Sequence, residues 1–295
     1  MMKAENSIVT QSQHSTKAIG IVGLGLIGGS LALDLQNLGW HVNALVHRSS
    51  TEQRAKERRL AQNISTDPQI LSECSIVILA LPINQLLTPS EKLVKSLPQA
   101  AVITDVGSVK SSIIKTWGKL HPRFIGSHPM AGTTDSGVDA GTKNLFKDCS
   151  WISTPIKGTD KEALEVIKQL AISLGSNWIT SDPEIHDQAV ALISHLPVLI
   201  SASLLATLEN INNPGVIKLA KVLASSGFAD TTRIGGGNPQ LGKDMTANNT
   251  ESILKALTTY RWTLEQFEEI VLASNWVQLE EELKKTKTIR KSLNI

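Results

Sequence analysis

The sequence predicts an α/β fold: a mostly parallel sheet with helices on both faces, followed by an all-helical second domain. Two observations support this prediction. In the first half of the chain, short apolar or β-branched segments alternate with longer amphipathic ones, which is typical of a parallel sheet covered by helices. After residue 181 the helical pattern continues without a convincing strand.

The predicted elements of the first half follow one another at short intervals. Strands are expected at residues 18–23, 42–46, 75–81 and 101–106, near 124–127 and 151–154, and at 177–180. Helices are expected at residues 26–38, 51–61, 109–120 and 160–174. The β-branched run 75–81 predicts a strand that is buried on both faces. Gly39 stands where the first helix needs a left-handed residue in order to end.

The second half opens with a signal for the start of a helix. Asp182 can cap a helix whose first residue is Pro183. Further along, apolar residues recur every three or four positions and predict a long amphipathic helix. These residues are Ile253, Leu257, Tyr260, Leu264, Phe267 and Val271. Such a helix needs a partner surface, and we expect a homodimer that forms through the C-terminal helices.

A glycine motif joins the first strand to the first helix. Gly23, Gly25 and Gly28 form the pattern G-x-G-x-x-G in that position. Gly23 permits the tight turn, Gly25 lets a pyrophosphate approach the backbone, and Gly28 lets helix and strand pack closely. The N–H groups at the start of the helix, around Leu26 and Ile27, would face the anion. The motif predicts a Rossmann-type dinucleotide-binding domain.

The end of the second predicted strand bears on the choice of cofactor. An NAD-binding domain has Asp or Glu about 20 residues past the glycines, where it bonds the ribose hydroxyls. Here Arg48, Ser49 and Ser50 follow the strand, and no carboxylate appears before Glu52. Arg48 can pair with a 2′-phosphate, and the serines can donate to it. We predict NADP rather than NAD, although Arg48 could also be a solvated charge.

The chain divides into three predicted segments. Residues 1–17 are mostly polar and are expected to form a disordered tail. Residues 18–181 form the dinucleotide-binding domain. Residues 182–295 form a helical domain for substrate binding and dimerisation.

The composition argues against several classes of partner. Lys and Arg total 29 against 27 Asp and Glu, so the net charge is +2, and we expect neither nucleic acid nor a membrane as partner. The two cysteines, Cys74 and Cys149, make no disulfide framework and no metal-binding cluster. The apolar stretches are short or interrupted by polar residues, so none is expected to span a membrane. A cytoplasmic protein without a metal is predicted.

Two polar residues in the first half are catalytic candidates. Ser108 lies in the segment 105–110 (DVGSVK) at the carboxyl end of a predicted strand, the edge where ligands of such sheets bind. His128 also follows a predicted strand, and Pro129 holds its backbone extended. A neutral imidazole can accept a proton near pH 7. From the residues alone, Ser108 suits a helix N-cap better and His128 suits a structural role better.

Two further candidates lie in the helical half. Arg233 precedes a glycine-rich bend and can bind a carboxylate with two hydrogen bonds, although an interdomain ion pair is the alternative. His195 lies in an apolar helix that Pro197 should kink. A buried histidine with satisfied hydrogen bonds is the default interpretation of His195.

Five segments together resemble the prephenate/arogenate dehydrogenase family, in particular its cyanobacterial-type arogenate enzymes. The segments are 23–30 (GLGLIGGS), 105–110 (DVGSVK), 128–132 (HPMAG), 194–197 (SHLP) and 230–233 (DTTR). The resemblance extends from about residue 18 to the final helices. It implies an enzyme that oxidises a small cyclohexadienyl substrate with a nicotinamide cofactor and releases carbon dioxide.

The resemblance also implies roles for the candidates. His128 matches the histidine that takes the proton of the ring hydroxyl, and Ser108 matches the serine that orients that hydroxyl or the histidine. Arg233 matches the arginine that binds a substrate carboxylate. His195 and Asp230 match residues that line the pocket.

One position bears on the substrate. Some relatives that use prephenate carry a carboxylate two residues past the glycine of the HPMAG segment, where this chain has Thr134 followed by Asp135. Together with Arg48, this departure favours arogenate, and prephenate is the alternative.

Two other functions are open to the same fold. A β-hydroxyacid-type dehydrogenase would use a helix-borne lysine, for which Lys243 or Lys221 could serve. A redox sensor would bind NADP without turnover. The first leaves the HPMAG and SHLP segments without a role, and the second lacks a visible partner-binding module.

Overall fold

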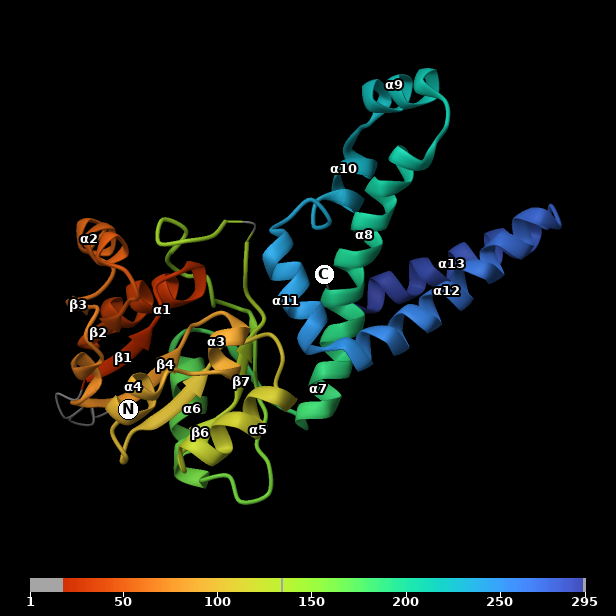
Figure 1. Cartoon of the computed structure of the whole chain (residues 1–295). Helices are drawn as coiled ribbons and strands as arrows, with labels where there is room; N and C mark the ends of the chain where they lie inside the picture. Colours follow the sequence, from red (N-terminus) through yellow and green to blue (C-terminus); the bar gives the residue numbers. More distant parts are fainter. Residues whose placement is uncertain (1–17, 134, 294–295) are drawn as a thin grey trace, which may run out of the picture. The chain divides into compact units, whose positions relative to one another are not determined.

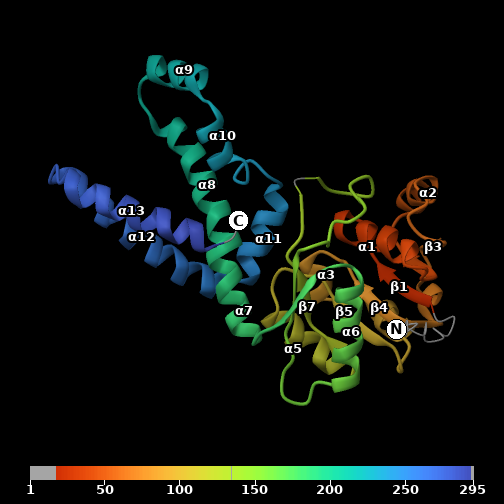
Figure 2. The same cartoon turned by 180° about the vertical axis from the view of Figure 1, so that it is seen from behind.

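The computed structural model describes residues 18–133 and 135–293, and the chain divides into two compact units. The first unit holds the chain up to Asp187 together with Gly237–Asn248, and the second holds Gln188–Gly236 and the chain from Asn249 onwards (Figures 1 and 2). The predicted tail at 1–17 and the position of Thr134 lie outside the described residues. The predicted domain division at 181/182 stays a prediction.

The first unit is built on a parallel sheet of six strands in the order β3-β2-β1-β4-β5-β6. The strands are β1 (Ala18–Val22), β2 (Val42–Leu45), β3 (Asn63–Ser65), β4 (Cys74–Leu79), β5 (Val102–Asp105) and β6 (Phe124–Ile125). The order reverses between β1 and β4, and ligands of open α/β sheets bind beyond the carboxyl ends of the strands at such a point. The predicted α/β fold is confirmed.

A second, three-stranded sheet was not expected from the sequence. It consists of β7 (Ser127–Pro129), β8 (Ser150–Ser153) and β9 (Asn177–Thr180), with β7 antiparallel and β9 parallel to β8. The single strand expected near 124–127 is therefore two strands that meet at Gly126. A Cβ at Gly126 would lie 2.8 Å from Ile114, so a larger residue would not fit where the chain leaves the first sheet.

Helices and a 3-10 turn surround the sheets of the first unit (Figure 1). They are α1 (Leu26–Asn37), α2 (Ser49–Glu57), η1 (Pro68–Leu71), α3 (Ile83–Leu87), α4 (Glu91–Ser96), α5 (Ser111–Leu120), α6 (Lys161–Ser173) and α11 (Pro239–Asn248). The four helices expected in the first half are present with shifted ends. The sequence did not predict β3, α3 or α4.

The core forms one layer on each face of the six-stranded sheet, and β4 contributes to both. Ile76 and Ile78 belong to the layer that includes residues of α1 and α6, whereas Val77 and Leu79 belong to the layer that includes residues of α5. Successive side chains of a strand point to opposite faces. This confirms the prediction of a strand that is buried on both faces.

Two predicted helix boundaries are confirmed by their hydrogen bonds. Gly39 has φ +86°, and Trp40 N–H donates to the Leu35 carbonyl at 3.0 Å, which ends α1 in a left-handed cap. Asp182 accepts the N–H of Glu184 at 2.8 Å, and α7 (Pro183–Val190) begins at Pro183.

The second unit is helical, and between Asp182 and Leu293 the described residues form no strand. Its elements are a π-helical turn η2 (Ala191–His195), α8 (Leu196–Thr207), η3 (Leu208–Asn210), α9 (Pro214–Leu223), α10 (Ser226–Thr232), α12 (Thr250–Leu272) and α13 (Trp276–Ser292). The π-helical turn precedes Pro197, which lacks a backbone N–H. The expected irregularity at this proline is therefore a change of helix type.

Much apolar surface of the second unit is not covered by its own chain. The expected long amphipathic helix is α12, yet Ile253 is buried while Leu264 and Val271 are each at least half exposed. The continuous helix Pro183–Asn210 is long and apolar enough to cross a membrane by length and composition alone, and 28% of its most apolar window is buried. Ser194, His195 and Pro197 do not interrupt this helix, yet length and composition alone do not make a membrane span, so the absence of a membrane-spanning stretch stays a prediction.

Both cysteines are free thiols. Cys74 is buried, and burial raises the pKa of its thiol to about 11. Cys149 is only half-buried, and its partial burial, together with the charge of Asp148, raises the pKa of its thiol as well. Neither thiol is therefore an activated nucleophile at neutral pH.

Candidate functional site

A cavity of about 530 Å³ opens at the carboxyl ends of β1, β2 and β4 in the first unit. The glycine motif, the end of β2 and the segment after β4 all contribute to its walls. Its lining includes Gly23, Leu24, Gly25, Val46, His47, Arg48, Thr51, Ala80, Pro82, Lys92 and Val138. The cavity lies where the strand order reverses, which is where a dinucleotide is expected.

The three glycines of the motif have different surroundings. Gly23 has φ +95°, and a Cβ there would lie 2.4 Å from the Ala80 carbonyl oxygen. A Cβ at Gly28 would lie 1.9 Å from the Gly23 carbonyl oxygen, so only glycine lets α1 start this close to β1. At Gly25 nothing lies within 4 Å of the Cβ position. This open space beside the N-terminus of α1 fits a pyrophosphate.

The end of β2 presents positive charge to the cavity. Arg48 lines the cavity, is exposed, and is the residue before α2, which begins at Ser49. Among the described residues that line the cavity, none is Asp or Glu. Lys92 of α4 also lines it, and its ammonium lies 3.4 Å from Asp67. The described lining of the cavity therefore offers cationic side chains and no carboxylate.

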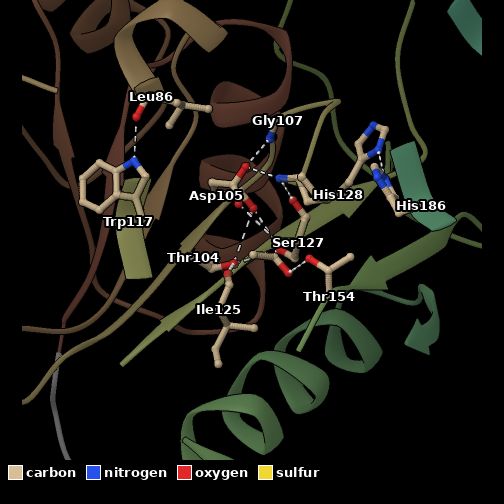
Figure 3. A network of polar contacts seen from close by, with 12 residues as sticks. Leu86, Thr104, Asp105, Gly107, Trp117, Ile125, Ser127, His128, Thr154 and His186 are labelled. Carbon is tan, nitrogen blue, oxygen red and sulfur yellow. Dashed lines mark hydrogen bonds and ion pairs between the residues drawn. The ribbon is translucent and has the colours of Figure 1, made fainter. Parts of the chain in front are cut away.

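A buried ion pair holds the segment after β5 in place (Figure 3). The side chains of Asp105 and Lys110 are both fully buried and form an ion pair, and Lys110 Nζ also donates to the Ser127 carbonyl at 2.8 Å. Burial raises the pKa of Asp105 and lowers that of Lys110. The Ser127 hydroxyl donates to the Asp105 carbonyl at 2.9 Å. These bonds tie β7, and hence His128, to the carboxyl end of β5.

His128 lies at the head of a hydrogen-bonded chain of side chains. Its Nδ1 is 3.0 Å from Nε2 of His186, and the two rings meet edge to face with centroids 5.2 Å apart (Figure 3). Nδ1 of His186 is 2.8 Å from Oδ1 of Asp187. His186 and Asp187 are buried, whereas His128 is half-buried. His128 is thus the member of the chain that is closest to solvent.

Asp187 in turn caps α5 from outside that helix. Its Oδ1 accepts the N–H of Lys110 at 2.7 Å, and its Oδ2 accepts the N–H of Ser111 at 2.9 Å. Burial alone would raise the pKa of Asp187, but the hydrogen bonds from His186, Ser111 and Lys110 hold that pKa below its usual value. Asp187 is therefore an anion at neutral pH.

Ser108 does not cap a helix. Lys110 is the N-cap of α5, and the carboxylate that binds the first N–H groups belongs to Asp187. The N-cap interpretation of Ser108 is corrected, because the capping group comes from α7. Ser108 lies half-buried on the turn between β5 and α5, at the edge of the sheet that holds the cavity.

The other candidates belong to the second unit. His195 is fully buried in η2, and its Nδ1 lies 3.2 Å from Nδ2 of Asn249. Asp230 and Arg233 are exposed on and just after α10. The lysines of the rival dehydrogenase hypothesis, Lys221 and Lys243, are exposed as well.

Sequence reasoning missed three residues of the site: His186, Asp187 and Lys92. The adjacent His and Asp at the start of a helix were a visible signal for the first two, but nothing in the sequence indicated that they meet His128. Lys92 comes from α4, a helix that the sequence did not predict.

The fold and the cavity define a Rossmann-type dinucleotide-binding domain, which a helical domain follows along the chain, and many dehydrogenases are built in this way. Family models match nearly the whole chain. Residues 31–180 match the nucleotide-binding domain of prephenate dehydrogenase, and residues 182–285 match its dimerization domain. The chain therefore belongs to the prephenate dehydrogenase family, whose members are oxidoreductases of aromatic amino acid biosynthesis.

Individual relatives agree with this assignment. The chain is 34% identical to prephenate dehydrogenase of Bacillus subtilis over 79% of its own length, an alignment that spans 64% of the Bacillus protein. It is 30% identical to cyclohexadienyl dehydrogenase of Zymomonas mobilis, covering 94% of this chain and 96% of that protein.

Solved structures give the same family. Synechocystis arogenate dehydrogenase superposes with a TM-score of 0.82 at 40% identity, covering 93% of this chain and 99% of that one. Prephenate dehydrogenase of Aquifex aeolicus, in complex with hydroxyphenyl propionate and NAD⁺, superposes with a TM-score of 0.89 at 29% identity, covering 96% of this chain and all of that one.

Proposed function

We propose that this protein converts arogenate to tyrosine with NADP as cofactor, releases carbon dioxide, and uses His128 as the proton acceptor. One observation carries the proposal. The dinucleotide cavity and the segment that holds β7, and hence His128, both lie at the carboxyl ends of the strands of the six-stranded sheet. The cavity follows β1, β2 and β4, and the segment after β5 holds β7 through Lys110. A cofactor and a proton acceptor would thus meet at the same edge.

The proposed cofactor site uses residues of this cavity. The N–H groups of Leu26 and Ile27, at the start of α1, would bind the pyrophosphate next to Gly25. Arg48 and Ser49 would bind the 2′-phosphate of NADP. The absence of Asp and Glu among the described lining residues supports NADP over NAD.

In the proposed mechanism, the protein positions the substrate and the cofactor and transfers one proton. A bound nicotinamide would take two electrons and the hydrogen of the carbinol carbon. His128 takes the proton of the ring hydroxyl, the ring carboxylate leaves as carbon dioxide, and His128 returns the proton to the oxygen of the new phenol. Ser108 would orient the hydroxyl. Aromatisation of the ring makes the reaction effectively irreversible.

Residues of the second unit would bind the rest of the substrate. Arg233 is exposed and has the guanidinium needed to bind a substrate carboxylate with two bonds. His195 and Asp230 would line the pocket. The likeness to Synechocystis arogenate dehydrogenase at 40% identity supports arogenate as the substrate.

We further propose a cytoplasmic homodimer that pairs through its C-terminal helices and binds neither nucleic acid nor a membrane. The apolar helix Pro183–Asn210 lies within the region that matches the family's dimerization domain. A protein partner is therefore a better explanation of its exposed apolar surface than lipid.

The test is a comparison of four reactions: arogenate or prephenate, each with NADP or NAD, followed by nicotinamide reduction. We expect the highest kcat/KM with arogenate and NADP. In the variant His128→Asn, we expect kcat to fall by about 10²–10⁴-fold while NADP still binds, because general-base catalysis contributes that much. His121→Asn is the matched control, since His121 is a buried histidine bonded to the Pro98 carbonyl.

Each other outcome removes a defined part of the proposal. Preference for prephenate would overturn the substrate, and preference for NAD would overturn the role of Arg48. No turnover by folded protein that binds NADP would overturn the activity itself.

A further inference from the structure

In the hydrogen-bonded chain His128–His186–Asp187, the chemistry of the side chains determines which atom donates and which accepts in each bond. Asp187 is an anion, and a carboxylate only accepts hydrogen bonds. The contact of 2.8 Å therefore requires His186 Nδ1 to carry the hydrogen. A neutral imidazole has one N–H, so Nε2 of His186 is left with a lone pair that can accept.

The same reasoning extends to His128. Its Nδ1 lies 3.0 Å from Nε2 of His186, and because that nitrogen carries a lone pair and no hydrogen, Nδ1 of His128 must donate. The remaining nitrogen of His128, Nε2, then carries a lone pair and no hydrogen. This is the nitrogen that would accept a proton from the substrate.

We infer that His186 and Asp187 are positioning residues that hold His128 in the tautomer whose Nε2 accepts a proton. The inference rests on the proposed function, in which His128 is the proton acceptor. The three side chains would act as the Asp–His pair acts in hydrolytic triads, where the carboxylate selects the tautomer of the base. Here a second imidazole stands between carboxylate and base.

The surroundings of Asp187 keep its charge available for this purpose. The N–H groups of Lys110 and Ser111 at the N-terminus of α5 fix both carboxylate oxygens. The ammonium of Lys110 is instead paired with Asp105 and the Ser127 carbonyl. The charged groups that the structure describes next to Asp187 include Lys110, whose charge is balanced by Asp105.

The chain also predicts how a positive charge on His128 is tolerated. After His128 takes a proton, both its nitrogens carry hydrogen, and the hydrogen bond to His186 is kept. The negative charge of Asp187 acts on this cation through a polarised His186, and both Asp187 and His186 are buried where charges are weakly screened. In the other tautomer, with hydrogen on Nε2 of His128, Nδ1 could not donate to His186 and Nε2 could not accept a proton.

The test compares two substitutions of His186 in the full-length protein. His186→Leu removes both ring nitrogens, and we expect kcat to fall on the order of a hundredfold while KM for the cyclohexadienyl substrate changes by less than about threefold. His186→Gln keeps an amide oxygen that can accept from His128, and it should recover most of the lost kcat. His121→Leu, at the other buried histidine of this unit, should leave kcat unchanged.

A measurement independent of activity reads the tautomer directly. In protein labelled with ¹⁵N-histidine, the signals of His128 are assigned as those lost in His128→Asn. We expect hydrogen on Nδ1 in the unsubstituted protein and a shift of hydrogen to Nε2 in His186→Leu, because an imidazole without a directing partner favours Nε2–H in water.

The outcomes separate this inference from the proposed function. If His128→Asn is inactive but His186→Leu retains normal kcat and the Nδ1–H tautomer, the positioning role is wrong and the proton acceptor stands. If His128→Asn turns over normally, the proposed role of His128 fails first. If His186→Gln is as impaired as His186→Leu, and both keep the Nδ1–H tautomer, His186 acts only by packing.

Discussion

At the scale of the residue, we predict that Arg48 makes the cofactor cavity select NADP. It is exposed at the wall of the cavity, where an NAD enzyme would place a carboxylate. We predict that Arg48→Ala weakens NADP binding by roughly tenfold or more, the loss of a charge-assisted hydrogen bond, and changes NAD binding by less than about twofold. Titration of each cofactor by calorimetry measures both values.

The control for this variant is Arg59→Ala. Arg59 is an exposed arginine just beyond α2 that is not among the residues lining the cavity. The substitution Arg59→Ala removes one positive charge, as Arg48→Ala does. The comparison therefore separates the loss of a contact with the 2′-phosphate from a general change in the electrostatic potential of the protein. An equal loss of NADP and NAD affinity in Arg48→Ala would refute the 2′-phosphate role.

The residues of the site could be predicted only in part, and the reason is their spacing along the chain. Gly23 and Gly28 lie in one strand–turn–helix unit and Arg48 follows the next strand, so local sequence pattern is sufficient to propose them. The bond between His128 and His186 joins residues 58 positions apart. Whether His128 meets His186 depends on how β7 leaves the first sheet, and no local sequence pattern encodes that path.

At the scale of the element, Gly28 sets how closely α1 approaches β1. We predict that Gly28→Ala lowers the free energy of unfolding by about 1–3 kcal/mol, the usual effect of forcing an added group into a packed site. It should also weaken cofactor binding, because α1 must move away from the Gly23 carbonyl. Thermal unfolding with and without NADP measures both effects.

Gly118→Ala is the matched control, since it makes the same change inside a helix where nothing lies within 4 Å of the new Cβ. Alanine favours a helix over glycine by about 0.5–1 kcal/mol, so this variant should be as stable as the unsubstituted protein or more so. If Gly28→Ala behaved in the same way, close packing at the motif would not matter.

In the first half of the chain, helices of nine residues or more and strands of four residues or more could be predicted, whereas three shorter elements could not. The strands β1, β2, β4 and β5 and the helices α1 and α6 lie close to their expected ranges. In contrast, β3 has three residues, α3 five and α4 six, which is too little chain to show a period of 3.6 or of alternation. The second sheet was missed because its strands resemble those of the first, and only their pairing differs.

At the scale of the whole molecule, the second unit has more apolar surface than a single chain can bury. On α9, Val216, Leu219, Val222 and Leu223 are between 51% and 74% exposed. Contiguous apolar surface of this kind marks an interface. The sequence already predicted that the C-terminal helices pair with a second copy, and this region matches the dimerization domain of the family.

We therefore predict that the protein sediments as a dimer, at twice the 31.9 kDa mass of the chain. Leu219→Glu combined with Val222→Glu should shift it towards monomer at micromolar concentration, because each carboxylate would be desolvated in the interface. Ile172→Glu, on the surface of α6 in the first unit and 48% exposed, is the control and should leave the dimer intact. A dimer that survives the double substitution would place the interface on other helices, and α12 and α13, with Trp262 and Val277 exposed, would be the next surface to test. A monomer in the unsubstituted protein would contradict the prediction outright.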